Sequence, residues 1–155
     1  MSPSRAVALG ALTVGVLDGL DAVVFFGLRG VAPLRIFQAI AAGVLGRAAF
    51  RGGLASAALG VMLHFCIALA IVAVYFLVSR RLPGLARRPF LWGPLYGIVV
   101  YLVMNLVVVP LSAAVNPPAS LAVVLNGLLI HMLGVGVPSA VAARWASRGH
   151  RGIGP

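Results

Sequence analysis

Four long apolar stretches constrain this chain more than any other feature of its sequence. They run over residues 6–28, 53–78, 90–111 and 118–143. A helix needs about 20 consecutive apolar residues to cross a hydrocarbon layer roughly 30 Å thick, and each stretch meets that length. Hydrophobic residues make up 62% of the chain and charged residues only 9%, which excludes an ordinary water-soluble domain. The sequence therefore predicts an all-α integral membrane protein, a bundle of four transmembrane helices in one domain over residues 1–155.

A shorter segment lies between the first and second predicted spans, over residues 33–50. Its apolar part, residues 36–45, would extend only about 15 Å as a helix, half of what crossing requires. Pro33 suits the first turn of a helix, and Arg35 and Arg47 can keep their charges at the lipid headgroups. We therefore expect a short helix that lies at the interface or re-enters the membrane. A full crossing by residues 36–45 stays an alternative.

The positive charge is concentrated at the ends of the predicted spans. Twelve arginines face only two acids, which gives a formal net charge of +10. In a soluble chain this would suggest nucleic-acid binding, but no long basic face remains once the spans are removed. We expect the arginines to meet the anionic headgroups of the lipid bilayer, and we expect no nucleic acid as a partner.

The distribution of these arginines also predicts the orientation of the chain. Four spans place both termini on one side, and that side receives the larger group: Arg5, Arg80, Arg81, Arg87, Arg88, Arg144, Arg148 and Arg151. The other side receives Arg29, Arg35, Arg47 and Arg51. Because arginines are enriched on the cytoplasmic side, both termini are predicted to be cytoplasmic. Aromatic residues near the span ends are predicted to be interfacial anchors as well: Tyr75, Trp92, Tyr96 and Trp145.

The only two acidic residues, Asp18 and Asp21, fall inside the first span, where an ionised carboxylate is costly. They lie three residues apart and therefore project from one face of a helix. Gly15 and Gly19 flank Asp18 with the GxxxG spacing that lets a neighbouring helix approach closely. We expect this face to point into the bundle.

The other three spans repeat this design, with small residues and a polar group at helical spacing. The polar members are His64, Tyr101, Asn105 and His131. The small members, which we expect to pack against neighbouring helices, are Gly60, Gly93, Gly97, Gly127 and Gly134. The span midpoints place Asp18, His64, Tyr101 and His131 within about one turn of a common plane. The polar residues are thus predicted to converge on one buried site.

These residue types favour proton chemistry. A carboxyl group beside an imidazole in the membrane can share a proton, and histidine is the side chain that titrates nearest to physiological pH. Our first hypothesis is therefore proton-linked transport or pH response through Asp18, Asp21, His64, Asn105 and His131. The plainer alternative is that the same groups form hydrogen bonds that hold the helices together.

Other classes of function leave different marks. A structural or assembly protein would use its small-residue faces to bind partner helices or a second copy of itself. A haem or metal protein would use His64 and His131, with Asp18 or Asp21 completing a metal shell, but two histidines without a ligand motif on one helix are a weak signal. We therefore expect no cofactor and no metal. The sequence contains no GxSxG, HExxH or P-loop motif, so we do not expect an enzyme.

Several of these residues resemble a known family. The series that carries the likeness is His64, Tyr75, Pro83, Gly93-Pro94-Leu95-Tyr96-Gly97, Asn105, Pro110 and Pro117-Pro118. It is similar to the YagU-like family of bacterial inner-membrane proteins, most clearly over residues 60–135 and only in general character before them. The resemblance implies a multi-pass protein of the bacterial cytoplasmic membrane, of unassigned activity, with membrane histidines at the positions of His64 and His131. Some relatives carry histidine where this chain has Asn105, so a site of three histidines is not expected here.

Overall fold

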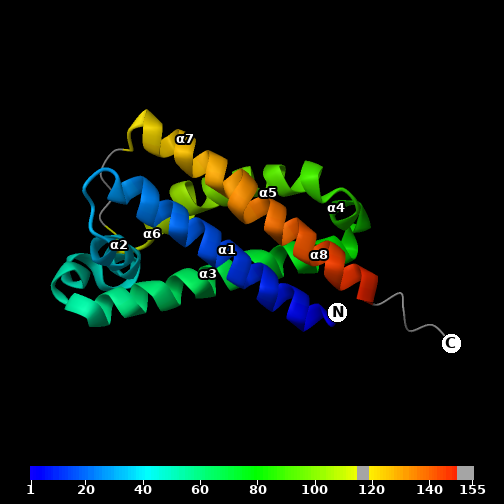
Figure 1. The fold of residues 1–155 in the computed structure, drawn as a ribbon, viewed down its shortest axis with the longest axis horizontal. Coiled ribbons are helices and arrows are strands. Elements are labelled where there is room, and N and C mark those ends of the chain that lie inside the picture. Colours follow the sequence, from blue (N-terminus) through cyan, green and yellow to red (C-terminus); the bar gives the residue numbers. More distant parts are fainter. Residues whose placement is uncertain (115–118, 150–155) are drawn as a thin grey trace.

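The computed structural model describes residues 1–114 and 119–149, and all the regular structure in those ranges is helical. Four segments are long and apolar enough to cross a membrane: Pro3–Gly27, Gly53–Arg81, Pro89–Leu111 and Leu121–Ser147. Figure 1 shows them lying lengthwise along one bundle, with both termini at the same end. The chain is thus an all-helical, multi-pass membrane protein, as its four apolar stretches predict.

The helices follow one another in a simple order. The first span is α1 (Pro3–Gly27), and α2 (Pro33–Leu45) and the 3-10 helix η1 (Gly46–Arg51) lie between it and the second span, α3 (Gly53–Arg81). The short α4 (Pro83–Arg87) leads into the third span, which consists of α5 (Pro89–Val103), the π-helix η2 (Met104–Val108) and α6 (Val109–Leu111). The fourth span consists of α7 (Leu121–Ile130), the π-helix η3 (His131–Gly136) and α8 (Val137–Gly149).

Prolines and serines set where the helices begin. Pro3, Pro33 and Pro89 each stand in the first turn of a helix, where the missing N–H group would have had no partner. Ser120 caps α7, because its hydroxyl oxygen accepts a hydrogen bond from the backbone N–H of Val123 at 3.4 Å. The predicted start of the fourth span, residue 118, lies outside the described residues, and the span ends at Ser147, beyond the predicted residue 143.

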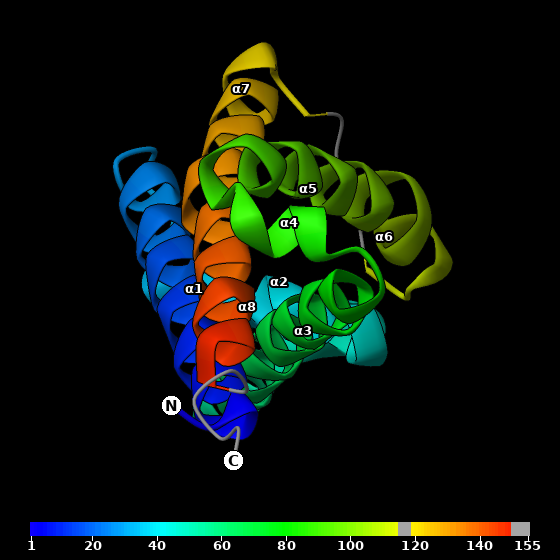
Figure 2. The same cartoon turned by 90° about the vertical axis from the view of Figure 1, so that its right-hand side faces the viewer.

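The second half of the fourth span, η3 and α8, occupies the centre of the bundle. Figure 2 looks along the bundle from the end that holds the termini, and α8 stands there between α1 and α5, with α3 below. The core between these helices is built of small apolar residues: Ala11, Val14, Ala68, Val72, Val100, Val135 and Ala142. Because the core residues are small, the helices approach closely, and the large apolar side chains face outward.

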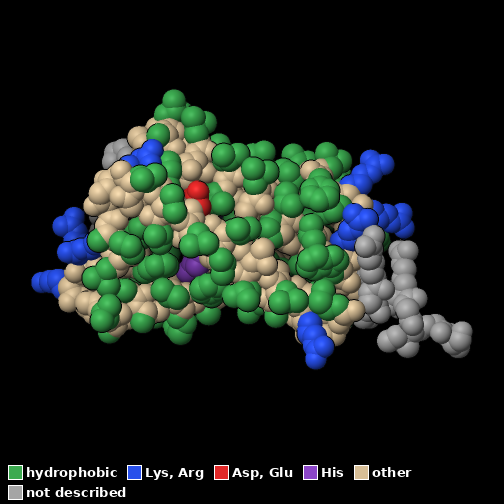
Figure 3. Space-filling view, in the orientation of Figure 1, with side chains coloured by type: hydrophobic (Ala, Val, Ile, Leu, Met, Phe, Trp, Pro, Cys, Tyr) green, Lys and Arg blue, Asp and Glu red, His purple; other side chains and the backbone are tan. Residues whose placement is uncertain are grey.

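The outer surface has the form that a bilayer requires. In Figure 3 apolar side chains cover most of the visible face, and the arginines stand at its two ends. Acidic and histidine atoms emerge on the same face between the two groups of arginines, and one arginine lies close to the acidic atoms. The molecule therefore carries its acids where hydrocarbon would surround them and its cations where headgroups would lie.

The third and fourth spans touch backbone to backbone. A Cβ atom added to Gly97 would overlap the carbonyl group of His131, and one added to Gly136 would overlap the carbonyl group of Gly93. Gly93 itself faces the backbone of Val137, where an added Cβ would come within 2.8 Å of its Cα. Glycine is needed at these positions because any side chain would separate the two helices.

Helix α2 packs tightly against the start of α3. The carbonyl group of Phe37 occupies the space that a side chain on Gly60 would fill. Gln38 is 1% exposed, and its Nε2 donates hydrogen bonds to the carbonyl oxygen of Gly53 at 3.0 Å and to the hydroxyl of Ser56 at 3.3 Å. A polar side chain and a backbone contact thus hold α2 in place.

Two of the predicted interfacial aromatics have a different role. Tyr75 is only 2% exposed, and its hydroxyl donates to the carbonyl oxygen of Leu85 at 3.0 Å, which ties α3 to α4. Tyr96 packs edge-on against Tyr75 with ring centroids 4.8 Å apart, and its hydroxyl donates to the carbonyl oxygen of Ile71 at 2.7 Å. The prediction of anchors was therefore wrong for this pair, because their hydroxyl groups find partners inside the bundle.

Candidate functional site

A partly open cavity of about 250 Å³ lies between the helices, lined by residues from the middle parts of all four spans. Its polar lining consists of Asp18, His64, Asn105 and His131, and α2 contributes Ile40 to a wall that is otherwise apolar. The space exists because α3 and the third span do not pack closely against each other in the described part of the chain. The structure thus brings these four sequence-predicted residues to one place.

Asp18 and His64 face each other between α1 and α3. Nδ1 of His64 lies 3.9 Å from Oδ2 of Asp18, and the two side chains are 12% and 27% exposed for the histidine and the acid. The other ring nitrogen, Nε2, lies 2.8 Å from the carbonyl oxygen of Gly15. A carbonyl oxygen only accepts, so Nε2 carries a proton and donates it. Nδ1 is therefore the nitrogen that can exchange a proton with the carboxyl group.

The glycine pair of α1 makes room for this arrangement. A Cβ atom on Gly19 would come within 3.3 Å of Nε2 of His64, and one on Gly15 would overlap the ring of Phe65. The GxxxG spacing of the first span therefore admits two side chains of α3 instead of its backbone. That fit brings the imidazole ring of His64 against α1.

The Asp18–His64 pair can take up and release one proton. With Nε2 protonated, the pair can be a carboxylic acid beside a neutral imidazole or a carboxylate beside an imidazolium, and both forms have no net charge. Loss of the shared proton leaves a single negative charge, which is expensive in an apolar bundle. At 3.9 Å a direct hydrogen bond is too long, so a water molecule in the cavity or a small rotation of the acid would connect the two groups.

His131 stands at the same cavity on the fourth span. Its Nδ1 donates to the carbonyl oxygen of Gly127 at 2.9 Å, which leaves Nε2 as the nitrogen able to accept a proton. The ring of Tyr101 packs edge-on against His131 with centroids 5.4 Å apart, in space provided by Gly127. Asn105 donates from its amide nitrogen to the carbonyl oxygen of Tyr101 at 2.9 Å. Tyr101 thus packs against the ring of His131 and is not one of the residues that line the cavity.

A widened turn presents His131. In η3 the N–H group of Val137 bonds to the carbonyl oxygen of Met132, five residues back instead of four. Pro138 follows directly, and a proline inside a helix has no N–H group and its ring clashes with the carbonyl group four residues before it. The π-helical turn relieves that clash, and such turns are frequent at functional sites.

The third span repeats the same device. In η2 the N–H group of Val109 bonds to the carbonyl oxygen of Met104, Pro110 follows at once, and Asn105 lies within the widened turn. Sequence reasoning missed both widened turns. A proline a few residues after a polar residue within an apolar span is the signal that could have found them.

Asp21 has a different partner. Its Oδ2 accepts a hydrogen bond from the amide nitrogen of Asn126 at 2.7 Å, which joins α1 to α7 outside the cavity lining. The two acids project toward different helices, so the predicted cluster separates into two sites. Asn126 was missed because it lies off the spacing of Gly127, His131 and Gly134 along the fourth span.

The predicted packing glycines meet neighbours within the same chain. Gly60 faces Phe37 of α2, Gly127 faces Tyr101 and Gly134 faces Leu17 of α1, where an added Cβ would come within 3.5 Å. Together with the close contact of the third and fourth spans, these glycines build the interior of one molecule. The helix faces that carry these glycines therefore already contact other parts of the same chain.

The cavity offers little to a metal ion. Within residues 1–114 and 119–149, no group of three or more histidine, cysteine or acidic side chains lies close enough together to hold one. His64 and His131 also each use one ring nitrogen on a backbone carbonyl group. The chemistry that the arrangement supports is proton exchange between oxygen and nitrogen.

Comparisons of the chain with protein families, with curated proteins and with solved structures find no match. The resemblance of residues 60–135 to the YagU-like family stays a prediction. The cavity and its polar residues are therefore the features that indicate a function.

Proposed function

We propose that this chain is a multi-pass protein of a bacterial cytoplasmic membrane that binds and transfers protons through Asp18 and His64. One observation carries the proposal: an acid and an imidazole from two different helices face each other at a cavity inside an apolar bundle. A carboxyl group at that depth does nothing for solubility, and an asparagine would join two helices at lower cost. Proton-linked transport is the role that this arrangement suits best, and pH response is its simpler form.

The cavity supplies a route beyond the pair. A space of about 250 Å³ with several polar groups on its wall can hold more than one water molecule. A proton released from the Asp18–His64 pair can pass along such water to Nε2 of His131, which becomes an imidazolium while the pair becomes a single anion. Asn105 contributes a neutral hydrogen-bonding group to the same cavity wall. The proposed relay thus uses one polar residue from each of the four spans: Asp18, His64, Asn105 and His131. Tyr101 takes no part in it.

The position in the membrane belongs to the same proposal. The larger group of arginines supports a cytoplasmic position for the end with both termini. Helix α2 then lies at the opposite face as an interfacial or re-entrant helix, with Arg35 donating to the carbonyl oxygen of Phe50 at 3.0 Å. Because Ile40 of α2 lines the cavity, this helix would limit access from that side. The YagU-like resemblance supports a bacterial inner membrane.

The alternatives draw less support from the contacts. An assembly protein would need its glycine faces free for partner helices, whereas Gly60, Gly93 and Gly97 face backbone of the same chain. A haem carrier would need a ring nitrogen of His64 directed to an open space, whereas Nε2 is held by Gly15 and Nδ1 faces Asp18. A homo-oligomer that uses the outer apolar surface remains compatible with the proton role.

Proton movement in liposomes tests the proposal. We expect the purified protein, reconstituted with a pH-sensitive dye inside the vesicles, to carry protons down an imposed gradient. Asp18→Asn and His64→Gln should each reduce the flux by about tenfold or more, because each removes one member of the exchanging pair. Asp21→Asn is the matched control: it neutralises the other acid, which lies outside the cavity, and should keep most of the flux. Equal flux in all four proteins would exclude proton transfer through the pair.

A further inference from the structure

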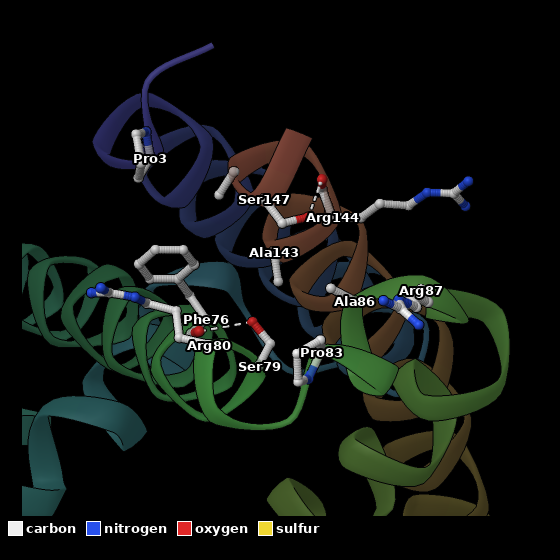
Figure 4. Close-up of a pocket in the computed structure, with 11 residues that line it drawn as sticks. Pro3, Phe76, Ser79, Arg80, Pro83, Ala86, Arg87, Ala143, Arg144 and Ser147 are labelled. Atoms are coloured by element: carbon white, nitrogen blue, oxygen red, sulfur yellow. Dashed lines mark hydrogen bonds between the residues drawn. The ribbon is translucent and has the colours of Figure 1, made fainter. Parts of the chain in front are cut away.

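A second and larger pocket opens at the end of the bundle that holds both termini. It has a volume of about 540 Å³ and lies between the start of α1, the end of α3, α4 and the end of α8. This pocket shares no lining residue with the mid-membrane cavity. Figure 4 shows Ser79 and Ala143 pointing into it, while the side chains of Arg80 and Arg144 start at its edge and extend outward on opposite sides, with Arg87 on the same side as Arg144. Three helices thus each contribute one guanidinium group.

The charge at this pocket is not neutralised by the chain's own acids. The only acidic side chains, Asp18 and Asp21, lie near the middle of α1, far along the bundle from this end. Among the described residues the single ion pair joins His64 to Asp18, so none of the three rim arginines has a carboxylate partner there. Arginine presents a planar fork of donors that matches the oxygens of a phosphate group. The rim therefore favours an anion.

The hydroxyl groups of the pocket are already occupied as donors. Ser79 donates to the carbonyl oxygen of Phe76 at 2.8 Å, and Ser147 donates to that of Arg144 at 2.8 Å. An anion in the pocket would have to be held by the guanidinium groups. Tyr75 fixes one side of this arrangement, because its bond to Leu85 holds α4, and with it Arg87, against α3.

The wall below the arginines is apolar. Phe76 lies one helical turn further into α3 than Arg80, and Ala86, Ala143 and Ala146 are buried around the floor. The pocket is much larger than one phosphate group needs, and its depth runs from the charged end of the bundle toward the apolar belt. An occupant with an anionic head and an apolar tail matches both parts, whereas a free anion would leave the apolar wall unused.

We propose that this pocket binds an anionic phospholipid, with its phosphate group at the rim, where the exposed side chains of Arg80 and Arg87 and that of Arg144 would turn inward to reach it, and with the start of its acyl chain against Phe76. Basic pockets between transmembrane helices are known to bind lipid headgroups at the cytoplasmic face. The lipid would sit against the ends of α3, α4 and α8 and would hold them together. This role is independent of proton transfer at the mid-membrane cavity.

Native mass spectrometry of the full chain in detergent, with phosphatidylglycerol or phosphatidylcholine added, tests the assignment. We expect phosphatidylglycerol to bind as one retained molecule and to be preferred over phosphatidylcholine. In the triple variant Arg80→Gln, Arg87→Gln, Arg144→Gln, the preference for phosphatidylglycerol over phosphatidylcholine should fall about fivefold for each arginine removed. The matched control is Arg29→Gln, Arg47→Gln, Arg51→Gln, which removes the same charge from the opposite end and should keep the preference.

The same measurement can overturn the proposal in two ways. Equal losses in the two triple variants would mean that only diffuse charge attracts the lipid, and no pocket is involved. Displacement of the lipid by inorganic phosphate at similar concentration would mean that the pocket takes a free anion. A further variant, Phe76→Ser, keeps every arginine and should weaken phosphatidylglycerol binding. Undiminished binding would show that the acyl chain does not contact Phe76.

Discussion

Asp18 faces only one of the two ring nitrogens of His64, because the other donates its proton to the carbonyl oxygen of Gly15 on the same helix as the acid. One imidazole therefore contacts α1 twice, once through a fixed hydrogen bond and once through an exchangeable proton. The fixed bond sets the tautomer of the neutral ring. A site of this kind is prepared to exchange a proton at Nδ1 without any movement of the helix backbone.

Asp18 and His64 should be energetically coupled. A double-mutant cycle with Asp18→Asn and His64→Gln, measured by reversible unfolding in mixed micelles, is expected to give an interaction energy of about 0.5–3 kcal/mol. The same cycle with Asp21→Asn in place of Asp18→Asn should give a value near zero, because Asp21 bonds to Asn126. Coupling of His64 to both acids alike would contradict the separation of the two sites.

Pro138 should control the position of His131. Pro138→Ala restores a backbone N–H group and lets η3 return to regular α-helical pitch, so stability should be unchanged or higher. The side chain of His131 would then turn away from the cavity, and proton flux should fall, as we also expect for His131→Ala.

Pro94 provides the control for that experiment. It lies inside α5 with no π-helix beside it, so Pro94→Ala should keep the flux. Full flux in Pro138→Ala would show that the widened turn is not needed to place His131.

Gly97 should tolerate no side chain. Gly97→Ala places a methyl group on the carbonyl group of His131 and is expected to cost about 1–3 kcal/mol in the free energy of unfolding. Gly27→Ala is the control, because no atom lies within 4 Å of the added methyl group, and its stability should change little. Thermal unfolding in detergent would measure both. Normal stability of Gly97→Ala, with loss of an oligomer, would favour the assembly alternative.

Gln38 should hold α2 through its shape as much as through its hydrogen bonds. Its Nε2 has two acceptors, but Oε1 is buried without a hydrogen-bond partner, which offsets part of the gain. Gln38→Met keeps the volume and should be close to neutral, whereas Gln38→Ala should destabilise the contact of α2 with α3 by about 1–3 kcal/mol. Hydrogen exchange of the α2 amides would report this. Equal protection in the two variants would argue against a packing role.

The sequence alone could predict the number and extent of the spans, because about 20 apolar residues in a row have few other stable environments. It could also predict that Asp18, His64 and His131 come together, since helical spacing and depth are both readable. Which face each residue meets was harder to predict. Gly60 packs against α2 and not against another span, and Asp21 turns to Asn126, because helix rotation is set by partners distant in the sequence.

The π-helices show a second kind of limit. Periodicity arguments assume one pitch along a whole span, and Pro110 and Pro138 break that assumption within the third and fourth spans. After each widened turn, the residues lie on a different face from the one that regular spacing assigns. The largest errors of a helical-wheel argument are therefore expected after a proline inside a span.

The placement of arginines at both ends and acids in the middle gives the bundle an electrostatic profile along its axis. The profile is positive, then negative, then positive, although Arg29 folds back onto Phe25, four residues after Asp21, and so lies near the second acid. A hydrated metal cation approaching either mouth would be repelled before it reached the acid that could attract it. Under the proposed proton transfer, a proton would be handed inward along water and side chains, so this profile would favour protons over metal cations.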